Sequence, residues 1–522
     1  WTEKQLSGPS VFNGLLDKPK PALGIERDMA CDPKINKRYY VPRKQVVGYY
    51  RDIAVLAFPT PIGEQEANPF RIKNWRAKSG FSKMNEYTMD KRKVSPDEII
   101  NFHDIMNVTS LIDNQGRLNW EVPEGNWTVI RFGYQPTGRE NHPAPFGGRG
   151  LEVDKLSSEA VDEYWKNSLA KIIQVSQSET QKVLRNILID SFEAGHQNWK
   201  ANFESEFQRL RGYNLLHYMP ALTGRVVGDL ETSEKFLWDF RKTLSDMITK
   251  NYYRRFEELC KKNVLNFSCE PYGRYGNTDD LAVCGIPQVP MTEWWAFRNR
   301  TSDLENAKLV ASAAHTYGRR IAGAEAFTGP PNRIFEAHPS ALKSQGDYFL
   351  CQGINQFHLH TFTHDPYEKV PGLGLGAYGS RFDRRNTWWS YARPWMNYIA
   401  RCQYMLQQGI FVADILYYAG EDAPKSAKAG VELSPSPLLS FDYDVCNREI
   451  LDKLNVREGS LILPSGMSYR MLVLPNKHHM RLEVLFKIEE LVAGGATVIG
   501  PKPLRISGLE GGKKAETQLK KI

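Results

Sequence analysis

The chain has 522 residues, of which 41% are hydrophobic and 25% are charged, and these values are typical of a globular protein with several domains. No window approaches eighteen consecutive apolar residues, so the sequence predicts no membrane-spanning helix. The formal net charge is +8, but the 68 basic residues are spread along the chain rather than gathered in one stripe, which argues against a nucleic-acid-binding protein.

Residues 1–150 are predicted to form a β-rich, sandwich-like module. The apolar runs at 46–50 and 53–58 have the composition of strands. Residues 118–122 alternate between polar and apolar, and a Pro-Glu-Gly-Asn turn signal separates them from the apolar run at 127–134. These two segments are therefore expected to pair as a hairpin.

From residue 151 the pattern changes to alternating strands and helices. Helices are predicted from Ser157, which is a plausible N-cap, and at 233–262 and 302–317. Between and after these helices lie five apolar runs, most of which end in an acid: 187–193, 264–270, 286–293, 320–325 and 353–360. Alternation of this kind predicts a parallel sheet.

Residues 151–410 are therefore predicted to be an α/β catalytic portion, a TIM-type (β/α) barrel. An open sheet rarely carries an acid at nearly every strand end, whereas a barrel has its chemistry there. A full barrel has eight strands, so the five runs are expected to be strands four to eight of a truncated barrel, with the first three upstream of Trp1. No signal-peptide pattern follows Trp1, and we favour a fragment of a periplasmic or secreted protein.

Residues 411–522 are predicted to form a C-terminal α/β accessory module. Strands are expected at 411–418, 471–475 and about 494–500, with a helix at 482–492. We expect no catalysis from this module.

Four glutamates at or just beyond the predicted strand ends are the main indication of chemistry: Glu193, Glu270, Glu293 and Glu325. Hydrolysis of a glycosidic bond needs one carboxylic acid to protonate the leaving oxygen and a second carboxylate to activate water or to attack the sugar. Glu193 and Glu325 are the predicted pair, because the ends of the fourth and seventh strands lie across a barrel mouth. One such glutamate could equally be a surface acid, but four at strand ends favour a glycosidase.

Six residues near these ends, Glu270 among them, are candidates for binding substrate: Asp190, Glu270, Tyr272, Trp294, His358 and His360. Trp294 and Trp295 follow Glu293 and could form a platform for a sugar ring. His358 and His360 form an HxH motif like the zinc ligands of amidohydrolases, but in those enzymes it normally lies on the first strand and here it lies on the last. Hydrogen bonding to sugar hydroxyls and plain packing at the strand end remain equal alternatives.

Several long stretches carry a more specific signal, and they occur in this order: GRGLEVDKLS, DSFEAGHQNW, FQRLRGYN, LTGRVV, WDFRKT, EPYG, EAFT, GINQFHLHTF, FDRRNTWW and RCQYMLQQG. Together they resemble the glycoside hydrolase family 106 α-L-rhamnosidases. The resemblance covers most of residues 150–420 and, more weakly, residues 1–150. It implies a carbohydrate-cleaving enzyme that releases terminal α-L-rhamnose from plant-type glycans or rhamnosides.

The resemblance also implies roles for individual residues. It places the general acid of an inverting mechanism at Glu193 and the general base at Glu325. It implies a calcium ion that grips the sugar hydroxyls, with Glu293 assisting at the sugar or as a metal ligand. The alternatives are a retaining β-galactosidase-like enzyme, a non-catalytic carbohydrate-binding fragment and a zinc hydrolase built on the His358 cluster.

Overall fold

The computed structural model describes residues 1–522 except 19–27, 33–36, 42–48, 67, 142–149, 176–182, 194, 272–277, 299, 331–332, 334, 370–371, 375–377 and 522. For residues 28–32, 37–41 and 65 it describes the backbone alone. Most of the predicted strand at 46–50 and the candidate Tyr272 therefore lie outside the described residues. No helix in the described part is both long and apolar enough to cross a bilayer.

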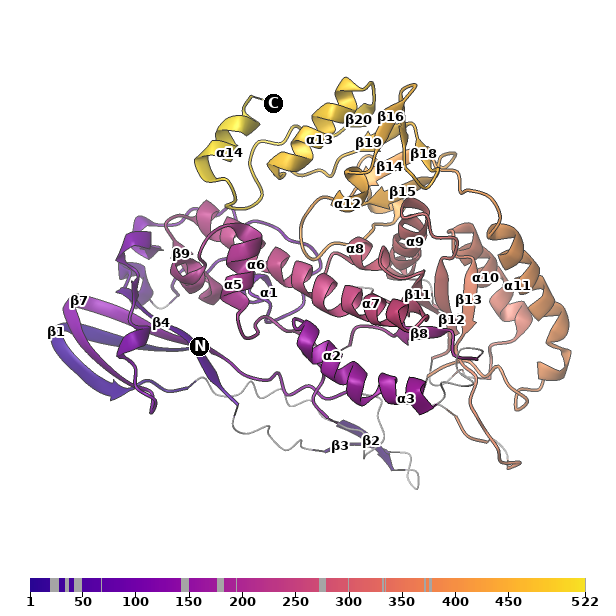
Figure 1. Cartoon of the computed structure of the whole chain (residues 1–522), viewed down its shortest axis with the longest axis horizontal. Helices are drawn as coiled ribbons and strands as arrows, with labels where there is room; N and C mark the ends of the chain where they lie inside the picture. The colour runs from indigo at the N-terminus through magenta and orange to yellow at the C-terminus, as the bar shows by residue number, and fades with distance from the viewer. Residues whose placement is uncertain are drawn as a thin grey trace. The chain divides into compact units, whose positions relative to one another are not determined.

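The chain divides into two compact units, each made of separate segments of the chain. The ribbon in Figure 1 is coloured by residue number. Unit 1 consists of residues 1–164, 193–247 and 508–510. Unit 2 consists of residues 165–192, 248–507 and 511–522. The predicted domain boundaries at 150 and 410 stay a prediction.

Unit 1 contains a four-stranded antiparallel sheet in the order β1-β7-β4-β6. Its strands are β1 (Thr2–Leu15), β4 (Arg51–Pro59), β6 (Met106–Asn107) and β7 (Arg117–Tyr134). The predicted hairpin within 118–134 is wrong, because β7 runs through the turn signal as one strand. The register of β1 against β7 shifts between Gly8 and Ser10, opposite the Pro123 region, and such a bulge accommodates a proline that cannot donate to the ladder.

The helical part of unit 1 is held by a buried ion pair. Its elements are α1 (Trp75–Lys78), α5 (Phe203–Arg211), η6 (Leu216–Thr223), α6 (Leu230–Ile248) and the short parallel pair β5 (Ile99–Ile100) and β9 (Val226–Val227). Lys78 Nζ lies 2.5 Å from Glu234 Oε1, and both side chains are 1% exposed. The Tyr87 hydroxyl also donates to Glu234, so this charge is fully engaged.

Unit 2 is built on a curled five-stranded parallel sheet, a half barrel, which confirms the predicted α/β class with a barrel-type sheet. The strand order is β13-β12-β11-β10-β8, so neighbours in space are neighbours in sequence. The strands are β8 (Asn186–Ile189), β10 (Asn266–Cys269), β11 (Val289–Trp295), β12 (Gly323–Thr328) and β13 (Gln356–Leu359).

Helices alternate with these strands along the chain (Figure 1). They are α2 (Ser158–Asn167), which begins in unit 1, then α3 (Leu169–Val175), α7 (Arg255–Lys262), α8 (Asp280–Cys284), α9 (Thr301–Thr316), α10 (Pro339–Cys351) and α11 (Arg393–Leu406). Ser157 caps α2 as predicted, because its hydroxyl accepts from the Ala160 amide. The predicted helix at 233–262 is observed as α6, a π-helical turn at Thr249–Arg254, and α7.

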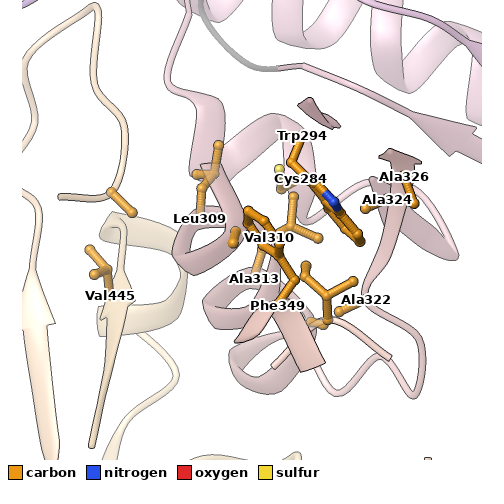
Figure 2. Packing of buried hydrophobic residues seen from close by; sticks show 14 of the residues in the cluster. Cys284, Trp294, Leu309, Val310, Ala313, Ala322, Ala324, Ala326, Phe349 and Val445 are labelled. Carbon is orange, nitrogen blue, oxygen red and sulfur yellow. The ribbon is translucent and has the colours of Figure 1, made fainter. Parts of the chain in front are cut away.

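One face of the half barrel is packed against its helices. Ala324 and Ala326 of β12 and Trp294 of β11 are completely buried. Trp294 stacks on Phe349 of α10 with ring centroids 4.2 Å apart (Figure 2). Because side chains alternate along a strand, the residues on either side of Trp294, Glu293 and Trp295, face the other way.

A second parallel sheet completes unit 2, in the order β15-β14-β19-β20. Its strands are β14 (Ile415–Tyr418), β15 (Tyr443–Cys446), β19 (Met471–Val473) and β20 (Thr497–Ile499), with helices α12 (Arg448–Leu451), α13 (Leu482–Ala493) and α14 (Gly512–Leu519). The sequence predicted three of these strands and missed β15. Contacts from α9 join the two sheets: Lys308 pairs with Asp442 at 2.5 Å and His315 Nδ1 lies 2.9 Å from Asp444 Oδ1.

Candidate active site

Three residues predicted to be functional lie side by side on adjacent strands. Glu293 of β11 is the register partner of Glu325 of β12, which is in turn the partner of His358 of β13. In a parallel sheet, register partners project from the same face. These side chains therefore lie opposite the packed face that holds Trp294 and Ala324.

Two more acids reach the same edge from the other half of the sheet. Asp190 directly follows β8, and Glu270 directly follows β10. One carboxylate oxygen each from Asp190, Glu270 and Glu325 lie within 4.8 Å of one another. Glu270 is 1% exposed, whereas Asp190 is open to solvent. We refer to Asp190, Glu270 and Glu325 as the acid cluster.

The acid cluster concentrates negative charge in a partly buried place. Burial, followed by the charges of Glu325, Asp190 and Glu293, raises the pKa of Glu270 well above its ordinary value. Burial, together with Glu293 and Asp190, raises the pKa of Glu325 to about 7, although a hydrogen bond from Thr328 opposes the rise. Carboxyls in such a group either share protons or share a cation.

A β-bulge shapes the strand that carries Glu325. Glu293 pairs with Glu325, but Trp295, two residues on, pairs with Thr328, three residues on, so β12 contains one extra residue. Phe327, within the bulge, has φ of 64°, a conformation that is uncommon for a bulky residue. The bulge brings the Thr328 hydroxyl back to Glu325, to whose Oε1 it donates at 2.5 Å.

His360 lies beside the same carboxylate oxygen. Its Nδ1 atom is 3.6 Å from Glu325 Oε1. Burial lowers the pKa of His360, so the ring is neutral at pH 7. His358 is more exposed, and its Nε2 atom lies 2.9 Å from Nε2 of Gln356. Of the two histidines, His360 is thus the one that contacts the acid cluster.

The other predicted site residues have different positions. Glu193 is half-buried, follows Asp190 by three residues, and belongs to unit 1, whereas the acid cluster belongs to unit 2. Trp294 is not a sugar platform in this structure, because it is 0% exposed and packs among Phe327, Phe349 and Phe357.

Three residues near the site were not singled out by sequence. Thr328 was missed because the alternation of side chains along a strand, which is all that the sequence indicates, does not show where a bulge adds an extra residue. Arg298 lies over the Trp295 ring, with its guanidinium carbon 3.8 Å from the ring centroid, and Tyr378 meets the same ring edge-on at 5.5 Å. Alternation from Glu293 could have identified Trp295, rather than Trp294, as the residue on the site face.

Comparison with known proteins identifies the family of the chain. The α-L-rhamnosidase family model, glycoside hydrolase family 106, matches residues 1–522. A Formosa agariphila protein named "Putative beta-glucuronidase" is 41% identical over 477 residues, which make up 91% of this chain and 40% of that protein.

The solved structure of a rhamnosidase from Novosphingobium sp. PP1Y is similar over 100% of this chain and 61% of its own chain, with 26% identity and a TM-score of 0.82. This chain thus spans less than two thirds of the length of either relative. The chain belongs to the α-L-rhamnosidase family, glycoside hydrolase family 106.

Proposed function

We propose that the protein is an α-L-rhamnosidase that releases terminal α-L-rhamnose from a plant-type glycan or a smaller rhamnoside. The observation that carries this proposal is the convergence of Asp190, Glu270 and Glu325 within 4.8 Å at the carboxyl edge of the half barrel. Enzymes built on such sheets bind substrate and do their chemistry at this edge. Family membership and the rhamnosidase neighbour support the same substrate.

The mechanism we propose is a single displacement with inversion at the anomeric carbon. Ionised Glu325 takes a proton from water while the water oxygen bonds to C1. The bond from C1 to the glycosidic oxygen breaks, and Glu193 donates a proton to that oxygen, so rhamnose and an alcohol leave. Thr328 and His360 both lie at Oε1 of Glu325, so we assign the proton transfer to Oε2.

The assignment of Glu193 as the acid is supported by its place in the chain and by the family resemblance of its segment. It lies three residues beyond Asp190, the residue that directly follows β8 of the half barrel. A general acid must be protonated before turnover, which a partly buried glutamate achieves more easily than an exposed one. Glu193→Gln is therefore expected to stop cleavage of substrates with poor leaving groups.

Calcium is the cofactor that we propose for this site. Its preferred ligands are carboxylate and other hard oxygens, which Asp190 and Glu270 would supply. The raised pKa of Glu270 fits such a site, because a cation would favour the ionised form that burial disfavours. Glu293, which neighbours Glu325 in register, is a further candidate ligand. When bound, calcium would hold and orient the sugar hydroxyls.

A second candidate, β-glucuronidase activity, is suggested by the name of the relative that is 41% identical. A glucuronide at the cleavage position would bring its own carboxylate to the acid cluster. Two like charges 4 Å apart repel by about 4 kcal/mol at an effective dielectric constant of about 20. Rhamnose has a methyl group where glucuronate has the carboxylate, so the acid cluster without a cation favours rhamnose.

The test compares the full-length protein on p-nitrophenyl α-L-rhamnoside and p-nitrophenyl β-D-glucuronide. We expect release from the rhamnoside alone, and we expect Glu325→Gln to abolish it. Glu489→Gln, an exposed position on α13, is the matched control and should be fully active. Proton NMR of the first-formed sugar should show the inverted anomer. Cleavage of the glucuronide alone would overturn the proposal, and a retained anomer would overturn the mechanism.

A further inference from the structure

The loop that follows β11 is fixed in place at the edge of the acid cluster. Trp295, the last residue of β11, lies on the same face as Glu293 and one step of about 7 Å nearer the carboxyl end. Gln345 of α10 donates from Nε2 to the carbonyl of Trp295 at 2.9 Å and to the carbonyl of Arg298 at 3.0 Å. The Gln345 side chain thereby holds the backbone of the loop at both Trp295 and Arg298, and so fixes the backbone from which the Arg298 side chain projects.

Arg298 is held against an aromatic ring and forms no ion pair with a described residue, although Asp303 and Glu293 act on its charge from a longer distance. Its guanidinium covers the Trp295 ring at 3.8 Å, and the side chain is half-buried. In the described part of the chain, no carboxylate lies within ion-pairing distance of this guanidinium. Arg300, two residues on, adds a second positive charge close enough to lower the pKa of Arg298 together with burial, which has the larger effect.

Arg333, in the same unit, also stacks on an aromatic ring, but its charge is paired within the protein. Arg333 lies over the Phe297 ring at 3.9 Å, as Arg298 lies over Trp295. Unlike Arg298, it is paired with a carboxylate, Glu336, at 2.6 Å. The charge of Arg333 is therefore neutralised within the protein, whereas the N–H donors of Arg298 remain available to a ligand.

We infer that Arg298 and Trp295 form a subsite for a uronic acid, the sugar to which the cleaved rhamnose is attached. The inference rests on the proposed rhamnosidase function. A guanidinium presents N–H donors in a planar fork that matches a carboxylate, and an indole offers an apolar face to a sugar ring. The acid cluster and Glu293 carry up to four negative charges, which the two charges of the proposed calcium would offset only in part, so a cation at the entrance favours the approach of an acidic glycan. Arg298 supplies that cation next to Glu293, while neutral rhamnose occupies the cluster itself.

The test uses two disaccharides that differ in one group: α-L-rhamnosyl-(1→4)-D-glucuronate and α-L-rhamnosyl-(1→4)-D-glucose, both as methyl glycosides. In the full-length protein, Arg298→Gln should lower kcat/KM on the uronate about 10- to 100-fold, the worth of a charge-assisted pair, and change the neutral substrate less than threefold. Arg298→Lys should recover part of the loss. Arg333→Gln, the matched control, should change the ratio of the two substrates by less than twofold. Equal losses on both substrates would show that Arg298 is structural and would overturn the subsite.

Equilibrium binding separates this inference from the proposed function. If the protein hydrolyses neither disaccharide nor p-nitrophenyl α-L-rhamnoside, the rhamnosidase proposal fails, but calorimetry can still compare the affinities of the protein for the two disaccharides. The subsite requires that the parent protein binds the uronate at least tenfold more tightly than the neutral compound and that Arg298→Gln loses this preference. Equal affinity of the parent protein for both compounds would overturn the subsite, whatever the catalytic result.

Discussion

Replacing Glu325 by glutamine is expected to stabilise the protein while abolishing its activity. In the folded, cation-free protein this carboxyl is crowded by Glu293 and Asp190, and burial and those charges raise its pKa to about 7. Glutamine has nearly the same shape and can still accept the hydrogen bond from Thr328, but it carries no charge. The substitution therefore removes an unfavourable charge together with the proposed base.

The size and the pH dependence of the gain in stability follow from the raised pKa of Glu325. A carboxyl whose pKa rises from 4.5 in the unfolded chain to about 7 in the fold costs about 3 kcal/mol of stability once it is ionised in both states. Below pH 4.5 it is protonated in both states and costs nothing. The cost grows between pH 4.5 and pH 7 and is complete above pH 7. At pH 8, Glu325→Gln should therefore be more stable by about 3 kcal/mol, and at pH 4 by close to zero.

The measurement is urea unfolding followed by tryptophan fluorescence, at pH 4 and pH 8. A chelator is present so that no cation binds the acid cluster and offsets the negative charge of Glu325. Glu489→Gln, the exposed control, should change the free energy of unfolding by less than about 0.5 kcal/mol at both pH values. Rhamnose release is measured on the same preparations. The like-charge explanation would be refuted if Glu325→Gln were no more stable than the parent at pH 8. It would also be refuted if the substitution increased the free energy of unfolding as much at pH 4 as at pH 8.

Three other substitutions and one treatment test the fold and the site. Trp294→Ala should lower the free energy of unfolding by about 3–5 kcal/mol, because it empties a fully buried aromatic site, whereas Trp295→Ala should raise KM with a much smaller loss of stability. Similar losses of stability in both would contradict the assignment of faces on β11. Lys78→Met should cost about 3–5 kcal/mol in urea unfolding by leaving Glu234 buried without its cation, and a loss below about 1 kcal/mol would show that solvent reaches Glu234. Removal of divalent cations should lower rhamnose release at least tenfold, with recovery on adding calcium but not magnesium, and activity unchanged by the chelator would remove calcium from the mechanism.

The arrangement of the half barrel was predictable from sequence because it depends on patterns within short segments of the chain. Each strand is a short apolar run, each is followed by a helix, and consecutive parallel strands joined in this way tend to be neighbours. The position of Glu270 at the end of such a run, and of Glu325 close to the end of another, was enough to bring both to one edge of the sheet.

What the sequence did not reveal depends on contacts between distant residues. The 18-residue strand β7 overrides its own turn signal because β1 pairs with it on both sides of that signal, between Arg117 and Arg131. Trp294 was assigned to the sugar because of its residue type, whereas its face is decided by the partners Phe349 and Phe357 from elsewhere in the chain. The strand β15 was missed because Asp444 interrupts its four residues, so no continuous apolar run marks it in the sequence.

The bulge in β12 lets the strand place Glu325 and Thr328 on the site face and still fill the core on its other face, which a regular strand could not do with the same residues. The site needs Glu325 and Thr328 on one face, and the core needs bulk on the other. In a regular strand only one side chain could enter the core between them, whereas here two do: Ala326 and Phe327 are 0% and 1% exposed. Residue 327 can therefore change in size to suit the aromatic core around Trp395 without altering the spacing of the catalytic face.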